Sequence, residues 1–171
     1  SPINIHMLGY DRNSATFAWE GRGDATEFKV EFAGLTQTVS APEVKFTGLT
    51  PGTKYSGNVV VTPLCGGKDG ESRSLAVNFT TLYEPLLITQ EEPYEVNTGS
   101  GNLPERWIVM QDGNDDGYSD LLNNPYGRIM VAMPEFVNPL SDLKLTISAW
   151  IYGDPLSVGY VTDVFDPSTF V

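Results

Sequence analysis

The sequence predicts an all-β protein built from antiparallel sandwiches, and three observations carry this prediction. Short segments alternate apolar and polar residues with a period of two, which is the pattern of strands with one buried face. Turn-forming residues separate these segments, since the chain holds 17 glycines and 12 prolines. No amphipathic helical stretch interrupts them. Short strands that follow one another at this spacing are typical of a sandwich.

The first half of the chain supplies five such segments. In the first three, the apolar residues share one face, so we expect them to point into a common core. The remaining two segments complete the set. The segments and their predicted inward residues are 14–20 with Ala15, Phe17 and Trp19; 27–32 with Phe28, Val30 and Phe32; a third with Val44 and Phe46; then 58–62 and 75–81.

One phrase in this half is more specific than the alternation. Residues 49–55 read L-x-P-G-T-x-Y, and they stand between Trp19 and the Phe-Thr-Thr phrase at residues 79–81. On these residues the chain from 1 to 82 resembles a fibronectin type III domain, an immunoglobulin-like sandwich. The Pro-Gly pair of the phrase would form the turn between sheets. The Tyr55 hydroxyl would bond back to the backbone as a tyrosine corner, and Trp19 would fill the core.

The second half, residues 83–171, also alternates, with predicted strands at 107–110, 128–134, 143–152 and 158–162. It is similar to the jelly-roll domains related to MAM and cleaved-adhesin modules, which follow fibronectin type III domains in bacterial surface proteins. Complete domains of that kind have several more strands. We therefore expect a partial jelly roll with open edges and an uncovered apolar face. The resemblance rests on Leu103, Pro104 and Trp107, on residues 133–136, on the 143–152 segment, and on the phrases at 158–163 and 166–171.

The charge is unevenly spread between the two halves. Residues 1–83 carry seven Lys/Arg and eight Asp/Glu, a net −1, whereas residues 84–171 carry three and fourteen, a net −11. Such an acidic half repels phosphates, so we expect no nucleic acid as partner. No apolar run approaches the ~20 residues that cross a bilayer, so we expect no membrane insertion in this segment.

An acidic loop in the second half is the clearest chemical signal. It begins with the pattern D-x-[DN]-x-[DN]-G, in which alternate side chains of a tight loop supply oxygen ligands to Ca²⁺. The twelfth position is Asn rather than Glu and no helices flank the loop, so it is not an EF-hand. The alternative is a solvated turn, because Asp, Asn and Gly favour turns. The predicted Ca²⁺ ligands are Asp112, Asn114, Asp116, Tyr118 through its carbonyl, Asp120 and Asn123.

The predicted strand at 143–152 presents two aromatic residues, Trp150 and Tyr152, on its polar face. Aromatic rings among polar neighbours are typical of a platform on which sugar rings stack. We therefore name Trp150 and Tyr152 as candidate ligand-binding residues. The alternative is that both rings pack under a loop, against the first domain, or against further strands.

Three other features are weaker evidence for a function. Residues 22–24 form an Arg-Gly-Asp tripeptide in a predicted loop, where a Gly/Asp turn explains it as well as integrin binding does. Cys65 has no second cysteine in the chain with which to form a disulfide. His6 is the only histidine and lies close to the chain end, so no catalytic residues are predicted.

Taken together, these observations predict a non-catalytic extracellular binding or adhesion segment of a bacterial cell-surface protein. Its partner would be a glycan or an extracellular protein, and its cofactor Ca²⁺. One alternative is an accessory region of a secreted hydrolase, either carbohydrate-binding or a spacer. Another is a purely structural spacer without a ligand.

Overall fold

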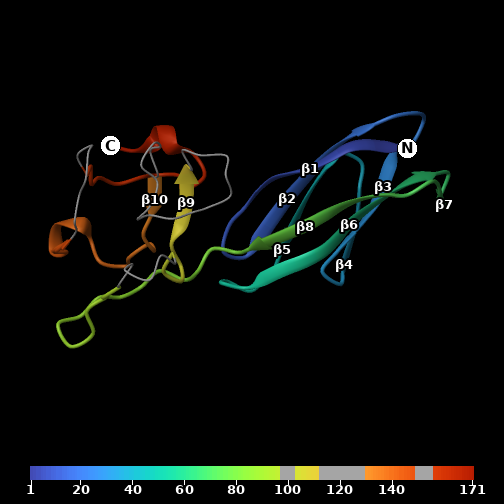
Figure 1. The fold of residues 1–171 in the computed structure, drawn as a ribbon. Helices are drawn as coiled ribbons and strands as arrows, with labels where there is room; N and C mark the ends of the chain where they lie inside the picture. Colours follow the sequence, from blue (N-terminus) through green and yellow to red (C-terminus); the bar gives the residue numbers. More distant parts are fainter. Residues whose placement is uncertain (97–102, 112–129, 149–155) are drawn as a thin grey trace. The chain divides into compact units, whose positions relative to one another are not determined.

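The structure is a computed structural model that describes residues 1–96, 103–111, 130–148 and 156–171. The chain divides into two compact units, Ser1–Glu84 and Pro85–Val171 (Figure 1). Over the described ranges, the regular elements are β-strands and two single-turn 3₁₀ helices, Leu140–Asp142 and Pro167–Thr169. The prediction of an all-β protein is confirmed.

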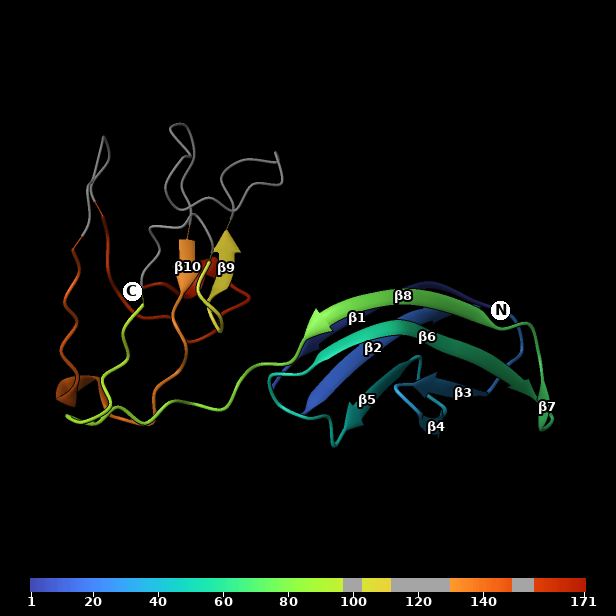
Figure 2. The same cartoon turned by 60° about the horizontal axis from the view of Figure 1, so that its bottom comes forward.

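The first unit is a two-layered antiparallel sandwich (Figures 1 and 2). One sheet has the strand order β1-β2-β5. The other has the order β4-β3-β6, and the long strand β6 pairs on its far side with both β7 and β8. The strands are β1 Pro2–Tyr10, β2 Ser14–Gly21, β3 Glu27–Phe32, β4 Leu35–Val39, β5 Glu43–Thr47, β6 Lys54–Cys65, β7 Lys68–Asp69 and β8 Arg73–Thr80.

The core of this unit lies between the two sheets and is rich in aromatic rings. Phe17 from one sheet meets Phe32 from the other edge-on, with ring centroids 5.2 Å apart. Trp19 meets Phe28 in the same way at 5.3 Å. Such edge-to-face pairs add to the stabilisation that burial of the rings provides. Every residue predicted to point inward is buried, namely Ala15, Phe17, Trp19, Phe28, Val30, Phe32, Val44 and Phe46.

The turn before β6 is held by side-chain bonds to the backbone. The Tyr55 hydroxyl accepts a hydrogen bond from the Thr50 backbone N–H at 2.9 Å, which confirms the predicted tyrosine corner. The Thr81 hydroxyl donates to the Thr50 carbonyl at 2.6 Å. Gly52 has φ +58°, and a Cβ built there would lie 2.5 Å from the Tyr83 ring. Only glycine fits this turn without strain, because it combines a left-handed backbone with a close neighbour.

Strands β1, β4 and β7 were not among the predicted segments. The register of β1 against β2 is broken by two irregularities, between Ile3 and His6 and between Met7 and Gly9. Ile3, Ile5 and Met7 nevertheless alternate with the exposed Asn4 and His6, so the period of two was present in the sequence and went unrecognised. β4 follows β3 through a two-residue turn, Ala33–Gly34, in which both residues have positive φ (50° and 76°). That geometry belongs to the tight hairpin turns that match the twist of paired strands.

The second unit is described in part. Its described sheet is the antiparallel pair of β9 (Ile108–Gln111) and β10 (Met130–Ala132), which agrees with the predicted strands at 107–110 and 128–134. Leu86 bridges Phe136 in parallel. The Asn138 side chain donates to the Ile88 carbonyl and accepts from the Ile88 N–H, at 3.0 and 2.7 Å. The jelly-roll resemblance itself stays a prediction.

The strand predicted at residues 143–152 is wrong over its described part. Residues 143–148, the described part of the predicted 143–152 strand, form no strand, and Leu145 and Ile147 of the expected core face are 49% and 48% exposed. Alternation creates a strand only where a neighbouring strand pairs with it and another layer covers its apolar face. In the described part of this unit, the buried apolar residues are Ala132 and Pro134.

The predicted strand at 158–162 is likewise absent from the described elements. Tyr160 and Val171 exchange both backbone hydrogen bonds, at 3.1 and 3.0 Å, but this single pair is not extended into a ladder. No helix in the described ranges is long and apolar enough to span a membrane.

Candidate functional site

The predicted calcium ligands Asp112, Asn114, Asp116, Tyr118, Asp120 and Asn123 lie outside the described residues. The residues on either side of this segment are described. Gln111, the last residue of β9, pairs with Met130, the first residue of β10. The segment that carries the acidic loop therefore joins two paired antiparallel strands. Within the described ranges, no group of three or more His, Cys, Asp or Glu residues is arranged to hold a metal ion.

The candidate ligand-binding residues Trp150 and Tyr152 also lie outside the described residues. Lys144, Thr146 and Ser148, which were expected on the same face, are exposed. The prediction of an aromatic platform is therefore untested.

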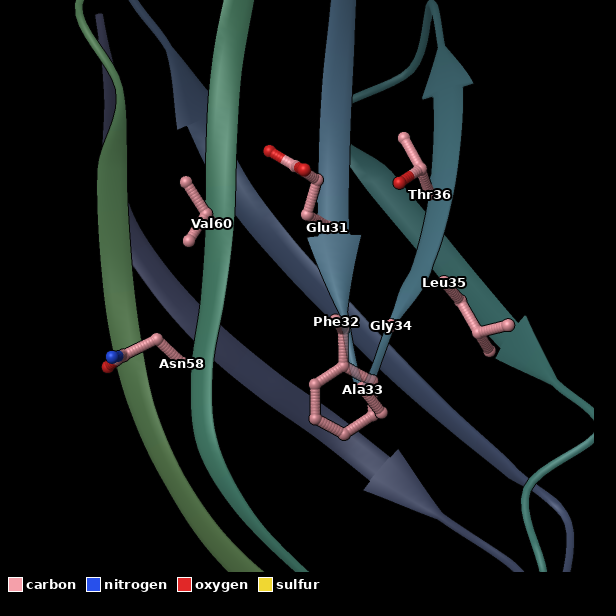
Figure 3. Close-up of a pocket in the computed structure, with 8 residues that line it drawn as sticks. All are labelled: Glu31, Phe32, Ala33, Gly34, Leu35, Thr36, Asn58 and Val60. Atoms are coloured by element: carbon pink, nitrogen blue, oxygen red, sulfur yellow. The ribbon is translucent and has the colours of Figure 1, made fainter.

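A surface feature that the sequence did not single out lies on the first unit. A shallow depression of about 290 Å³ opens beside the β3–β4 hairpin and reaches β6 (Figure 3). The hairpin turn forms one end of it, and β6 forms the side away from β4. Polar side chains from all three strands mix here with apolar ones. The residues that line it are Glu31, Phe32, Ala33, Gly34, Leu35, Thr36, Asn58 and Val60.

Strand register explains why these side chains meet. Val30 pairs with Val61 and both are buried, so their neighbours Glu31 and Val60, which also pair, point to the outer face. Glu31 pairs on its other side with Thr36. A carboxylate, a hydroxyl and a methyl-bearing side chain thus lie in one row across three strands. This row can accept and donate hydrogen bonds beside an apolar contact.

The charges on this face are unequal. Lys29 lies two residues before Glu31 on β3 and therefore points to the same outer face of the sheet. Its ammonium group donates to the Asp69 carboxylate at 2.6 Å. That hydrogen bond raises the pKa of Lys29, with smaller contributions from the charges of Asp69 and Glu31. Lys29, Asp69 and Glu31 together carry a net charge of −1, because Lys29 offsets only one of the two carboxylates. We expect the face to attract a cationic group.

β4 is the edge strand next to this face (Figures 1 and 3). Leu35 pairs with Phe32 across a two-residue turn, a position at which the two residues exchange both backbone bonds. Bonding and non-bonding pairs alternate along an antiparallel ladder, so Gln37 and Val39 also bond to β3. Thr36 and Thr38 therefore direct their backbone N–H and C=O groups away from the sheet.

The remaining candidates are exposed. The Arg-Gly-Asp tripeptide, residues 22–24, lies in the connection between β2 and β3, and Gly23 there has φ +91°. The Ser1 ammonium donates to the Arg22 carbonyl at 2.9 Å. Cys65 is a free, exposed thiol at the end of β6. His6 Nδ1 lies 2.8 Å from the Asn4 carbonyl.

Comparison with known families identifies the first unit. Residues 1–78 match the family model of the fibronectin type III domain. The first unit is a fibronectin type III domain. Its sandwich, tyrosine corner and buried Trp19 agree with the resemblance read from residues 1–82. The depression and the β4 edge thus belong to the larger sheet of a fibronectin type III domain. No curated protein sequence matches the chain.

Several solved structures are similar to about half of the chain. A fibronectin type III domain of human collagen α-1(XX) is 23% identical, with a TM-score of 0.41, and the match covers 50% of this chain and 88% of that one. A chitinase from Bacillus thuringiensis is 19% identical, with a TM-score of 0.38, over 45% of this chain and 13% of the chitinase. An exopolygalacturonase from Yersinia enterocolitica is 14% identical, with a TM-score of 0.40, over 52% of this chain and 21% of the exopolygalacturonase.

Sequence reasoning missed the depression for two reasons. Part of its lining comes from segments 27–32 and 58–62, which were taken only as core strands, and residues 33–36 belong to no predicted segment. A local signal for β4 was nevertheless present. After the Ala-Gly turn, Leu35, Gln37 and Val39 alternate with Thr36 and Thr38, which is a period of two. The alternation is weak because Gln37 occupies an inward position. Its amide donates to the Lys45 carbonyl of β5 at 3.0 Å, which satisfies this polar group at the sandwich margin.

Proposed function

We propose that this chain is a non-catalytic binding or adhesion segment of an extracellular, cell-surface protein of a bacterium. The observation that carries the proposal is the fibronectin type III domain in residues 1–78, since such domains are generally non-catalytic modules. In this proposal the domain acts as a spacer, and the second unit presents the ligand surface. The ligand is a glycan or an extracellular protein. The step from fold to function rests on family analogy.

The proposal assigns two roles within residues 112–152. The oxygens of Asp112, Asn114, Asp116, Tyr118, Asp120 and Asn123 would hold Ca²⁺, a hard cation that prefers carboxylate and carbonyl ligands. Trp150 and Tyr152 would stack on a sugar ring. The pattern D-x-[DN]-x-[DN]-G and the aromatic pair among polar residues support these roles.

A glycan array probed with the intact chain, once in calcium and once in EDTA, tests the proposal. Binding that requires calcium is expected, and it should disappear in Trp150→Ala. Tyr160→Ala is the matched control, because Tyr160 is an aromatic residue of the same unit that is 49% exposed and lies outside the proposed platform. An equal loss of glycan binding in Trp150→Ala and Tyr160→Ala would contradict a specific role for Trp150.

The other outcomes separate the alternatives. Binding in both buffers would keep the glycan ligand and remove the calcium loop from recognition. Absence of binding in both would remove the glycan and leave a protein partner or a spacer. Sequencing the complete gene separates adhesion from an accessory role, because a neighbouring catalytic domain favours an accessory region of a secreted hydrolase. Further adhesin-like modules favour adhesion.

A further inference from the structure

The free edge of β4 presents unpaired backbone groups beside an anionic face. Thr36 and Thr38 direct two N–H and two C=O groups outward, as the alternation of bonded pairs requires. Among the described backbone–backbone hydrogen bonds outside regular ladders, none involves either residue. An edge of this kind is a template to which another extended chain can add.

β4 also lacks the devices by which proteins protect such edges. Its sequence, Leu-Thr-Gln-Thr-Val, contains no charged residue and no proline, and its register against β3 is uninterrupted. β1, an edge strand of the other sheet, carries two bulges and contains Pro2. β5, the opposite edge of that sheet, has its Lys45 carbonyl bonded by the Gln37 side chain. Pro, charge and bulges are the usual means of blocking strand addition, so β4 is an edge left open to it. β8, the other edge of the same sheet, also has an uninterrupted register and no proline, but it carries a charged residue, Arg73.

The face beside β4 selects the chemistry of an added chain. Strands lie about 4.8 Å apart, so a strand added to β4 would lie about 10 Å from β3. A side chain that it placed on the outer face next to Thr36 would extend over Thr36 toward Glu31. Figure 3 shows the Glu31 carboxylate turned toward Val60 of β6, so the contact requires the Glu31 side chain to rotate toward β4. In that rotamer the long stem of an arginine or lysine brings its charged head to the carboxylate. Lys29 is held by Asp69 at 2.6 Å, so Glu31 keeps the net negative charge of this face.

We propose that the β4 edge of the fibronectin type III domain is a docking site for an extended segment of a partner protein. The segment adds as a fifth strand to the row β4-β3-β6-β8 and places an arginine or lysine over Thr36 toward Glu31. Backbone hydrogen bonds to Thr36 and Thr38 supply affinity, and the Glu31 contact supplies selectivity. This surface belongs to the first unit and does not depend on the ligand surface proposed for the second.

Two peptides test the proposal with the intact 171-residue chain. The probe is a seven-residue peptide of alternating threonine and valine with arginine at its centre, and its twin has glutamate instead. Titration is followed through the backbone amide resonances of the protein. The arginine peptide is expected to shift the Thr36 and Thr38 amides, and the glutamate twin is expected to bind at least about threefold more weakly, as for an exposed charge pair. Shifts centred on another element, or equal binding of both peptides, would overturn the proposal, as would no binding at millimolar peptide.

Protein variants locate the contact. Thr36→Pro removes an outward N–H without removing a bond to β3, so it is expected to weaken binding more than tenfold while the domain stays folded. Glu31→Gln should reduce the preference for arginine over glutamate to within about twofold. Retained binding by Thr36→Pro would refute strand addition. If that variant fails to fold, two peptides replace it, one N-methylated at the odd positions and the other at the even positions. Strand addition uses the N–H groups of only one of these sets, so one of the two methylated peptides must lose binding.

A second copy of the chain is the competing occupant. Sedimentation of the chain without peptide measures this self-association directly. A monomer up to about 100 μM, the range in which weak specific contacts appear, supports a hetero-partner. A dimer that Thr36→Pro dissociates would instead assign the edge to self-association and overturn the proposal.

Discussion

Substitution of Trp19 by alanine tests the packing argument most directly. Trp19 is 3% exposed and meets Phe28 edge-on at 5.3 Å between the two sheets. Truncation of a buried tryptophan to alanine costs about 3–5 kcal/mol through lost burial and the cavity that remains. A domain of this size has a free energy of unfolding of roughly 4–12 kcal/mol, so the variant should lose a large part of its stability.

The indole nitrogen modifies this magnitude. Trp19 Nε1 is buried, and it has no hydrogen-bond partner in the part of the chain that the structure describes. An unsatisfied buried donor costs about 1–3 kcal/mol in the native state, and alanine relieves that cost. The loss for Trp19→Ala should therefore lie near the lower end, at about 3 kcal/mol. Trp19→Phe keeps a ring against Phe28 and removes the donor, so it should cost less than about 1.5 kcal/mol.

The assay must report on the first unit alone, because the chain has two units. Native-state hydrogen exchange of backbone amides in β3 and β6, the central strands of the larger sheet, gives the free energy of global opening of this unit. A loss below about 1 kcal/mol in Trp19→Ala would refute the assignment of the inward face. Equal losses in the alanine and phenylalanine variants would refute the argument from the orphan indole donor.

The other predictions concern the backbone, a proposed metal and a carboxylate. Ala33→Gly should stabilise the first unit by about 0.5–1 kcal/mol, because Ala33 has φ +50°, which glycine adopts without cost; a lower melting temperature would contradict this. Gly52→Ala should destabilise it by more than about 1–2 kcal/mol, since the new Cβ meets the Tyr83 ring at 2.5 Å, and Tyr83→Ala should recover part of the loss in a double mutant. Calcium should raise the melting temperature of the second unit, and Asp116→Ala should abolish that rise; an unchanged melting curve in millimolar calcium removes the proposed site. Hydrogen bonds from the Ser14 side chain, and then from the Asn13 and Ser14 backbone, lower the pKa of Asp11 below 3.8 in the folded state. The ionised Asp11 therefore contributes its full stabilisation above pH 3.8, and this contribution declines as the pH falls through the lower pKa of the folded state. Asp11→Asn should lower the free energy of unfolding most near neutral pH and least in acid, as urea unfolding at several pH values measures.

Particular residues show where prediction from sequence succeeded. The alternation of Phe28, Val30 and Phe32 with charged residues specified the inward face of β3, because successive side chains of any strand point to opposite sides. Tyr55 was assigned to its hydrogen bond from a seven-residue phrase, since that contact spans five positions of the chain. Both features depend on neighbours in sequence.

Prediction failed where distant segments decide the outcome. Residues 143–148 alternate as well as β3 does, yet they form no strand, and Ile147 is exposed. A strand requires a paired neighbour and a covering layer, and neither can be read from the segment itself. The nine-residue strand β1 was missed for a different reason, since its alternation of Ile3, Ile5 and Met7 with exposed residues is present in the sequence and was not used.

The sequence by itself therefore determined the fold class, the core faces of the first unit and the turn before β6, since periodicity and turn chemistry act over a few residues. Only the tertiary structure decided that β4 is a free edge, that Glu31 lies beside Thr36, and that Lys29 is bound by Asp69, forty residues away. Strand order and register come from pairing between distant segments, so the surface that they assemble is a property of the folded sheet rather than of any one stretch of the chain.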